Sequence, residues 1–324
     1  MEAIRPGGGG VRSGRRGRCG PPGTYRETVG IKRLVAVLMT TLLAGCAPAG
    51  AAAPGAPPPA RPAPVAAYAV GVRTFTVDPT SARPLPVTVW YPADGGAVAP
   101  GRFPVVVYSH GLHSLPELHA GLTARWAAAG FVVAAPAYPH TRRGAARFSR
   151  ADVRHQPADG WRLIRHLVRL DTRAGDPLAG HLDVARVAAA GHSAGGFTTA
   201  GMFTSGRSGR LRAGIVIAGG GTAGSFAGPA VPLLFVHGTA DRIVPVTVGR
   251  AAYHRTAGPT AFLSLLGQGH GEYLTPGLPG FDQVLATTTD FLRWTLYGDP
   301  AAGRRLPGDA RRPGVTAFET HPAR

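Results

Sequence analysis

The stretch Gly191-His192-Ser193-Ala194-Gly195 decides the fold because of its place in the chain. It directly follows an apolar run at 186–190 and directly precedes a helical pattern at 194–204. A serine on a sharp strand-to-helix turn has a strained backbone and crowded neighbours, so small residues must flank it. A glycine-rich turn whose serine only caps the next helix is the alternative interpretation. The context favours a nucleophilic Ser193.

Outward from this turn, short apolar runs alternate with helical patterns. The expected strands cover 70–77, 86–91, 104–109, 131–135, 186–190, 213–218, 231–236 and 261–266, and the expected helices cover 115–129, 158–171, 194–204, 245–256 and 281–297. This alternation predicts βαβ units, and hence an α/β fold with a mostly parallel central sheet and helices on both faces. Because no helix separates the first two strands, the sheet is expected to begin antiparallel.

The serine needs a base, and that base needs a third group to orient it. His270 lies in a glycine-flanked loop after the run 261–266, from which it can reach the nucleophile. A core or surface histidine is the alternative interpretation. His254 is a poorer candidate because it lies inside a helical pattern. We predict that His270 is the base.

Asp241 is the best candidate for the third group. It follows the run 231–236, at the carboxyl end of a strand, where open α/β sheets bind ligands. The chain order Ser…Asp…His is the order of α/β-hydrolases. Asp241 could instead cap the helix that follows it. If it does, Asp282 and Glu272 are the next carboxylates to test.

Acyl transfer also requires two backbone N–H groups directed at the developing oxyanion. The residue after the nucleophile, Ala194, supplies one. The loop Ser109-His110-Gly111-Leu112, which follows the run 104–109, is expected to supply the other through Leu112.

Composition excludes several classes of protein. Hydrophobic residues make up 44% of the 324 residues and charged residues 16%, which excludes a coiled coil, a collagenous rod and a fully disordered chain. Of the net charge of +18, residues 1–45 carry +6, and the other +12 comes from scattered arginines without a basic stripe among aromatics, so we expect no nucleic-acid partner. The sequence has no zinc-binding helix motif and no dinucleotide or ATP loop after a strand, so neither metal nor cofactor is expected. Both cysteines, Cys19 and Cys46, precede the expected domain, which excludes a cysteine nucleophile.

The amino-terminal region is expected to direct export. Residues 1–45 combine a glycine- and arginine-rich extension with a basic and then apolar segment typical of a secretory signal. The string Leu43-Ala44-Gly45-Cys46 resembles the lipobox of bacterial lipoproteins, which implies a lipid on Cys46. A plain secretory signal or a short membrane anchor is the alternative. The sequence therefore predicts a protein anchored to the outer face of the cell membrane by lipid, or an extracellular one.

Four segments follow from these patterns. After residues 1–45, an Ala/Pro/Gly linker at 46–67 favours an extended stalk. One catalytic domain is expected at 68–300, followed by a tail at 301–324.

The blocks FPVVVYSHGLHS, GFVVAAPAYPHT, DVARVAAAGHSAGG, HGTADRIVP and GQGHGEY resemble the α/β-hydrolase superfamily over roughly residues 70–298. The similar branch includes dienelactone-hydrolase-like, chlorophyllase-like, platelet-activating-factor-acetylhydrolase-like and cutinase-like polyester-degrading enzymes. The resemblance implies that Ser193, His270 and Asp241 form the triad and that Leu112 and Ala194 are the oxyanion donors. True dienelactone hydrolases use cysteine, so their lactone substrate does not carry over. The C-terminal disulfides of polyester hydrolases are absent from this sequence.

We therefore expect a serine carboxylic-ester hydrolase that acts on small or polymeric esters as a monomer. A peptidase or acyltransferase of the same fold is the main alternative, and a non-catalytic binding lipoprotein is the third. The segment 137–157 is expected to border the substrate cleft. The stretch Gly219–Gly228 is too short and flexible for a lid, so no interfacial activation is expected.

Overall fold

The computed structural model describes residues 62–206 and 208–321. The expected signal at 1–45, Cys46 and most of the linker lie outside the described residues. The strands are β1 (Ala69–Val77), β2 (Leu85–Asp94), β3 (Ala97–Val98), β4 (Phe103–Ser109), β5 (Val132–Pro136), β6 (Leu182–His192), β7 (Leu211–Ile217), β8 (Leu233–Gly238), β9 (Thr260–Leu265) and β10 (Thr316–His321).

These strands form one mixed sheet within the described part of the chain. Its order is β1-β2-β5-β4-β6-β7-β8-β9-β10, with β3 paired to β2 alone. From β5 to β9 in this order, all neighbouring strands are parallel. In contrast, β2 is antiparallel to both of its neighbours β1 and β5. The mostly parallel sheet with an antiparallel start is therefore confirmed.

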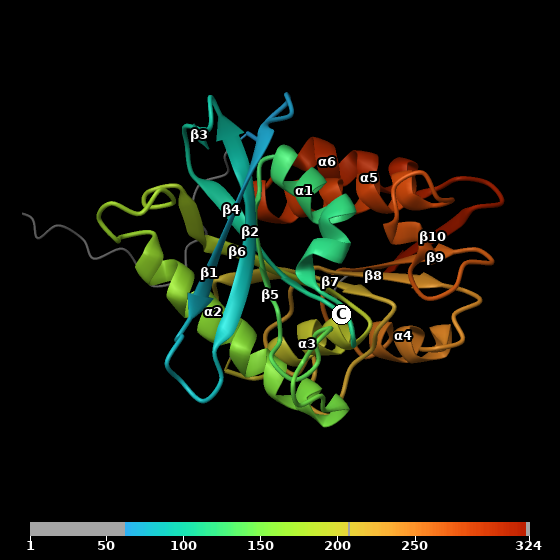
Figure 1. Ribbon diagram of the computed structural model, residues 1–324. Coiled ribbons are helices and arrows are strands. Elements are labelled where there is room, and N and C mark those ends of the chain that lie inside the picture. Colours follow the sequence, from blue (N-terminus) through green and yellow to red (C-terminus); the bar gives the residue numbers. More distant parts are fainter. Residues whose placement is uncertain (1–61, 207, 322–324) are drawn as a thin grey trace, which may run out of the picture. The chain divides into compact units, whose positions relative to one another are not determined.

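Helices cover both faces of the sheet (Figure 1). They are α1 (Ala120–Ala128), α2 (Gln156–Leu170), α3 (Ala194–Met202), α4 (Val246–Tyr253), α5 (Phe281–Leu292) and α6 (Pro300–Ala310), with short 3₁₀ or π turns η1 (Pro116–His119), η2 (Arg150–His155), η3 (Glu272–Leu274) and η4 (Arg293–Tyr297). No helix among these is long and apolar enough to cross a bilayer.

Alternate residues of each central strand belong to opposite cores. In β4, Val105 and Val107 pack with α2, whereas Val106 and Tyr108 pack with α1 and α5. Every residue of β4 is buried. A strand covered on both faces has no polar side, which is why its sequence reads as a continuous apolar run.

The carboxyl-terminal region differs from the tail expected at 301–324. Residues 300–310 form α6, which Asp299 caps by accepting the amide of Ala301 at 2.8 Å. Strand β10 then pairs antiparallel with β9 and closes that edge of the sheet. The helix contains Pro307 and two glycines, residues with low helix propensity, so its local pattern was too weak to predict it. Its packing on α5, which includes an Arg305–Asp290 ion pair at 2.8 Å, compensates for that weakness.

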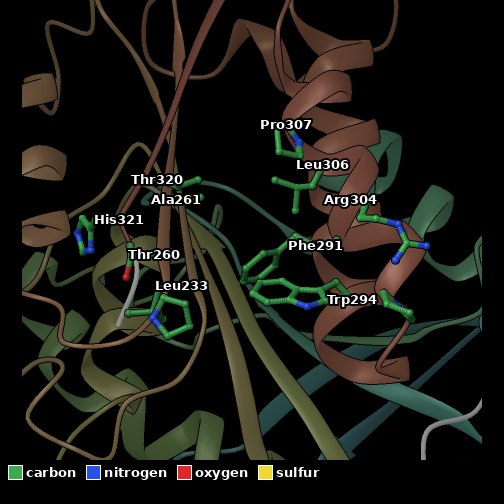
Figure 2. A pocket seen from close by; sticks show the side chains of 13 residues that line it. Leu233, Thr260, Ala261, Phe291, Trp294, Arg304, Leu306, Pro307, Thr320 and His321 are labelled. Atoms are coloured by element: carbon green, nitrogen blue, oxygen red, sulfur yellow. The ribbon is translucent and has the colours of Figure 1, made fainter. Parts of the chain in front are cut away.

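A cavity of about 560 Å³ lies between this carboxyl-terminal unit and the amino ends of β8 and β9. Figure 2 shows Phe291 and Trp294 projecting into it from the helical side toward Leu233. In a parallel sheet the amino ends of strands lie opposite the carboxyl ends, where the predicted catalytic residues are found. This cavity is therefore separate from the candidate site described next.

Candidate active site

Ser193 lies between the last residue of β6, His192, and the first residue of α3, Ala194. Its backbone has φ 57° and ψ −120°, a conformation that costs a non-glycine residue about 1–3 kcal/mol. A Cβ atom on Gly195 would overlap the carbonyl oxygen of Ser109, and one on Gly191 would overlap the carbonyl oxygen of Gly195. Both glycines of the motif are therefore required for this turn to form.

His270 connects the serine to the aspartate. Its Nε2 lies 2.8 Å from Oγ of Ser193, and its Nδ1 lies 2.8 Å from Oδ2 of Asp241. Because a carboxylate only accepts hydrogen bonds, Nδ1 carries the proton and Nε2 is left to accept one from the serine hydroxyl. The imidazole is thus oriented as a general base.

Asp241 is held as a carboxylate in the loop after β8. Its side chain is fully buried. Burial alone would favour the neutral acid, but the hydrogen bond from His270 and the amides of Val244 and Ile243, each 2.9 Å from Oδ1, outweigh it. The pKa of Asp241 consequently lies below its ordinary value. The two amide hydrogen bonds close a turn directly after Asp241. The residue that precedes α4 is Pro245, so Asp241 does not cap this helix.

Among the described residues, the competing candidates form no hydrogen bond or ion pair with Ser193, His270 or Asp241. The carboxylate of Glu272 accepts the amide of Gly271 at 3.2 Å, and Asp282 is exposed in the first turn of α5. His254 is exposed at the end of α4. Within the described residues, Asp241 is the carboxylate that forms an ion pair with His270.

His237 is a member of the site that sequence reasoning missed. It lies near the end of β8, buried, with Nε2 2.8 Å from the carbonyl oxygen of Val244 and 3.3 Å from Oδ2 of Asp241. Burial lowers the pKa of His237, so it acts as a neutral donor. Through these two contacts it stabilises the loop that carries Asp241. Its place in the block HGTAD, four residues before the aspartate, was the available signal.

His192 stabilises the backbone of the loop that carries His270. Its Nε2 lies 2.5 Å from the carbonyl oxygen of His270. Burial lowers the pKa of His192 to about 4, so at neutral pH the ring is uncharged and donates a single N–H to this carbonyl. The variable second position of the serine motif thus contacts the loop that carries the base.

The two expected oxyanion donors border the same cleft as Ser193. Within residues 62–206 and 208–321, neither the amide of Leu112 nor that of Ala194 donates to another group. A Cβ on Gly111 would come within 3.2 Å of the Cβ of Ser193, so glycine allows the loop to approach the nucleophile closely.

His110 holds the loop that contains Leu112. Its Nδ1 donates to the carbonyl of Gly111 at 2.7 Å, and its Nε2 accepts the amide of Tyr138 at 3.1 Å. Burial lowers the pKa of His110 to about 4, which keeps one nitrogen as donor and the other as acceptor. The ring of His113 stacks on Phe148 with ring centroids 3.8 Å apart. The 137–157 segment therefore supports the oxyanion loop.

A cleft of about 670 Å³ contains the serine and the histidine. It extends from the oxyanion loop across η2 and α3 to the loop after β8. Its lining residues are Leu112, His113, Arg150, Ala151, Val153, Arg154, Pro157, Ser193, Ala194, Phe197, Gly201, Thr222, Ile243, Val244 and His270. As expected, the segment 137–157 borders the cleft, and it does so mainly with residues of η2. Among the described residues, no cluster of histidine, cysteine or carboxylate side chains could hold a metal ion.

A family model described as PET hydrolase-like (PETase) matches residues 56–269. The chain belongs to this family. The match confirms the resemblance to polyester hydrolases of the α/β-hydrolase superfamily, and with it the predicted fold class. Because this is a family of carboxylic ester hydrolases, the chain is an ester hydrolase. No curated protein matches the sequence.

The matched range contains Ser193 and Asp241 and ends one residue before His270. The assignment of the base therefore rests on the hydrogen bonds described above. The same geometry separates His270 from the other histidines near the cleft, because it alone contacts both Ser193 and Asp241 among the described side chains.

Proposed function

We propose that this chain hydrolyses carboxylic esters through an acyl-enzyme formed on Ser193. The observation that carries the proposal is the continuous hydrogen-bonded chain from Ser193 through His270 to Asp241, with both links at 2.8 Å. These three residue types in this order supply a nucleophile, its base and the group that orients the base.

In the first half-reaction, Nε2 of His270 takes the hydroxyl proton as Oγ attacks the ester carbonyl carbon. The resulting oxyanion receives hydrogen bonds from the amides of Leu112 and Ala194, worth about 3–4 kcal/mol for each donor. His270 then returns the proton to the leaving alcohol, and the acyl group stays on Oγ. In the second half, His270 takes a proton from a water that attacks the acyl carbonyl carbon. It then returns this proton to Oγ as the bond between Oγ and the acyl carbon breaks, which releases the acid and free Ser193.

Short or medium acyl esters and ester polymers are the proposed substrates. The cleft holds about 670 Å³, within the usual range for small-molecule sites. Ile243 is 70% exposed at its border, an apolar contact for a polymer chain. The stretch 219–228 supplies Thr222 to the lining but is too short to serve as a lid, so we expect no interfacial activation.

A substrate panel tests this proposal. We expect p-nitrophenyl esters to be hydrolysed with rates that fall for long acyl chains, a polyester film to release soluble acid, and peptide amides to react slowly. A fluorophosphonate probe should label the wild type and not Ser193→Ala. Amides cleaved faster than every ester would favour a peptidase, and acyl transfer to alcohols in preference to water would favour an acyltransferase. No labelling of the folded protein would favour a non-catalytic binding lipoprotein.

We further infer that the protein is exported, that Cys46 carries lipid as the first mature residue, and that the linker at 46–67 separates this lipid from a monomeric catalytic domain. The support is the LAGC string after a basic and apolar segment. In this proposal the catalytic domain extends beyond residue 300 to include α6, which contacts α5, and β10, which pairs with β9.

Cys46→Ser should release the protein from the membrane fraction or block its maturation, because the thiol is the site of lipid attachment. Membrane fractionation and intact-mass measurement of the purified protein check this. Wild-type protein that fractionates as soluble and carries residue 46 without added lipid mass would contradict the anchor.

A further inference from the structure

The cleft beside Ser193 is lined by arginines but by no carboxylate side chain. Two of its lining residues are arginines, Arg150 and Arg154, and none is an aspartate or glutamate. Both arginines come from η2, which lies between the 137–157 segment and α2. An ester held at Ser193 therefore lies in a cleft whose permanently charged lining side chains are both cationic.

The acidic residue of η2 is turned away from this cleft. Asp152 is buried and accepts two hydrogen bonds from Arg83, both at 2.7 Å. Arg83 also contacts Asp159 of α2, with its Nη2 at 2.6 Å from Oδ2. This network fixes the turn so that its carboxylate faces the interior while Arg150 and Arg154 line the cleft.

Neither arginine is neutralised by a carboxylate within the described residues. Arg150 forms no ion pair there, and Nε of Arg154 donates to Nε2 of His155 at 3.1 Å. Arginines elsewhere in the protein do have such partners, for example Arg73 with Asp176 at 2.6 Å. Both cleft arginines are exposed, so their donors are available to a ligand.

We propose that Arg150 and Arg154 bind a carboxylate on the substrate, so that the enzyme prefers esters with a free acid end, such as half-esters of dicarboxylic acids. A guanidinium matches a carboxylate with two parallel N–H donors and stays charged at every working pH. Each cleavage of a polyester creates such a carboxylate end, so the site would favour short chains released from the polymer. This inference rests on the proposed ester hydrolysis at Ser193.

A matched pair of esters tests the inference. Mono(4-nitrophenyl) suberate carries a free carboxylate, and 4-nitrophenyl methyl suberate is the same chain with that end neutral. We expect the wild type to have the higher kcat/KM for the anionic ester, mainly through a lower KM. In Arg150→Gln/Arg154→Gln the ratio of the two kcat/KM values should fall about five- to tenfold, the size expected for two partly exposed charge contacts. The wild-type preference should also decrease as salt is raised.

Arg147→Gln is the matched control, because Arg147 lies in the same segment but does not line the cleft. It should keep the wild-type ratio. A wild-type ratio at or below one, or an equal fall in the ratio for Arg147→Gln and the double variant, would overturn the carboxylate site while leaving ester hydrolysis intact. Failure of the wild type to hydrolyse either ester would instead contradict the proposed function itself.

Discussion

Asp241→Asn is expected to lower kcat by about 10⁴-fold while the fold stays intact. An asparagine amide that donates to Nδ1 of His270 would move the imidazole proton to Nε2, the atom that must accept the proton of Ser193. The amides of Ile243 and Val244 can still bond to the asparagine oxygen, so the loop should keep its shape. Steady-state hydrolysis of p-nitrophenyl butyrate gives kcat, and urea unfolding checks stability.

Asp282→Asn is the control for this prediction. It removes one negative charge from an exposed position in the first turn of α5, away from His270. Its kcat should remain near that of the wild type. If Asp241→Asn retained near-normal turnover, another carboxylate would orient His270, and Glu272→Gln would be the next variant to measure.

Arg83→Met should lower the free energy of unfolding by about 3 kcal/mol. Arg83 joins the β1–β2 connection to η2 and α2 through Asp152 and Asp159, whose side chains are 7% and 4% exposed. Removing the guanidinium leaves two buried carboxylates without their main partner. Burial of the guanidinium would lower the pKa of Arg83, but the hydrogen bonds that Arg83 donates to these two carboxylates outweigh it and raise the pKa. Urea denaturation followed by far-UV circular dichroism measures the change.

Glu319→Gln provides the comparison for an exposed ion pair. Glu319 contacts Arg250 at 2.6 Å, but the two side chains are 45% and 37% exposed. Because water screens such a pair, the loss should stay below about 1 kcal/mol. Equal losses in the two variants would show that the Arg83 network contributes no more than a surface contact.

The strands and the positions of Ser193, Asp241 and His270 could be predicted from sequence because their signals are local. The apolar runs of the central strands follow from their burial on both faces, as in β4. The glycines around Ser193 follow from a steric requirement within the turn itself. Parallel strands bring their carboxyl ends to one edge, so three loops far apart in the sequence could be expected to meet.

The carboxyl-terminal unit could not be predicted in this way. The segment that forms α6 has weak helix propensity, and β10 is a short strand at the edge of the sheet. Both are stabilised by contacts with distant parts of the chain, namely α5 and β9. A window of local sequence contains none of these partners.

By itself the sequence determined the order of the main strands and helices from β1 to α5, the strained serine turn and the three residues that meet there. Tertiary structure alone decided which side chains support them. These are His237, which contacts Asp241, His192, which contacts the carbonyl of His270, and the buried Asp152, whose turn leaves two arginines lining the cleft. The physical reason is the separation along the chain over which each kind of interaction acts. Backbone periodicity and steric limits act between neighbours in the chain, whereas hydrogen bonds between buried side chains form only after folding has brought distant segments together.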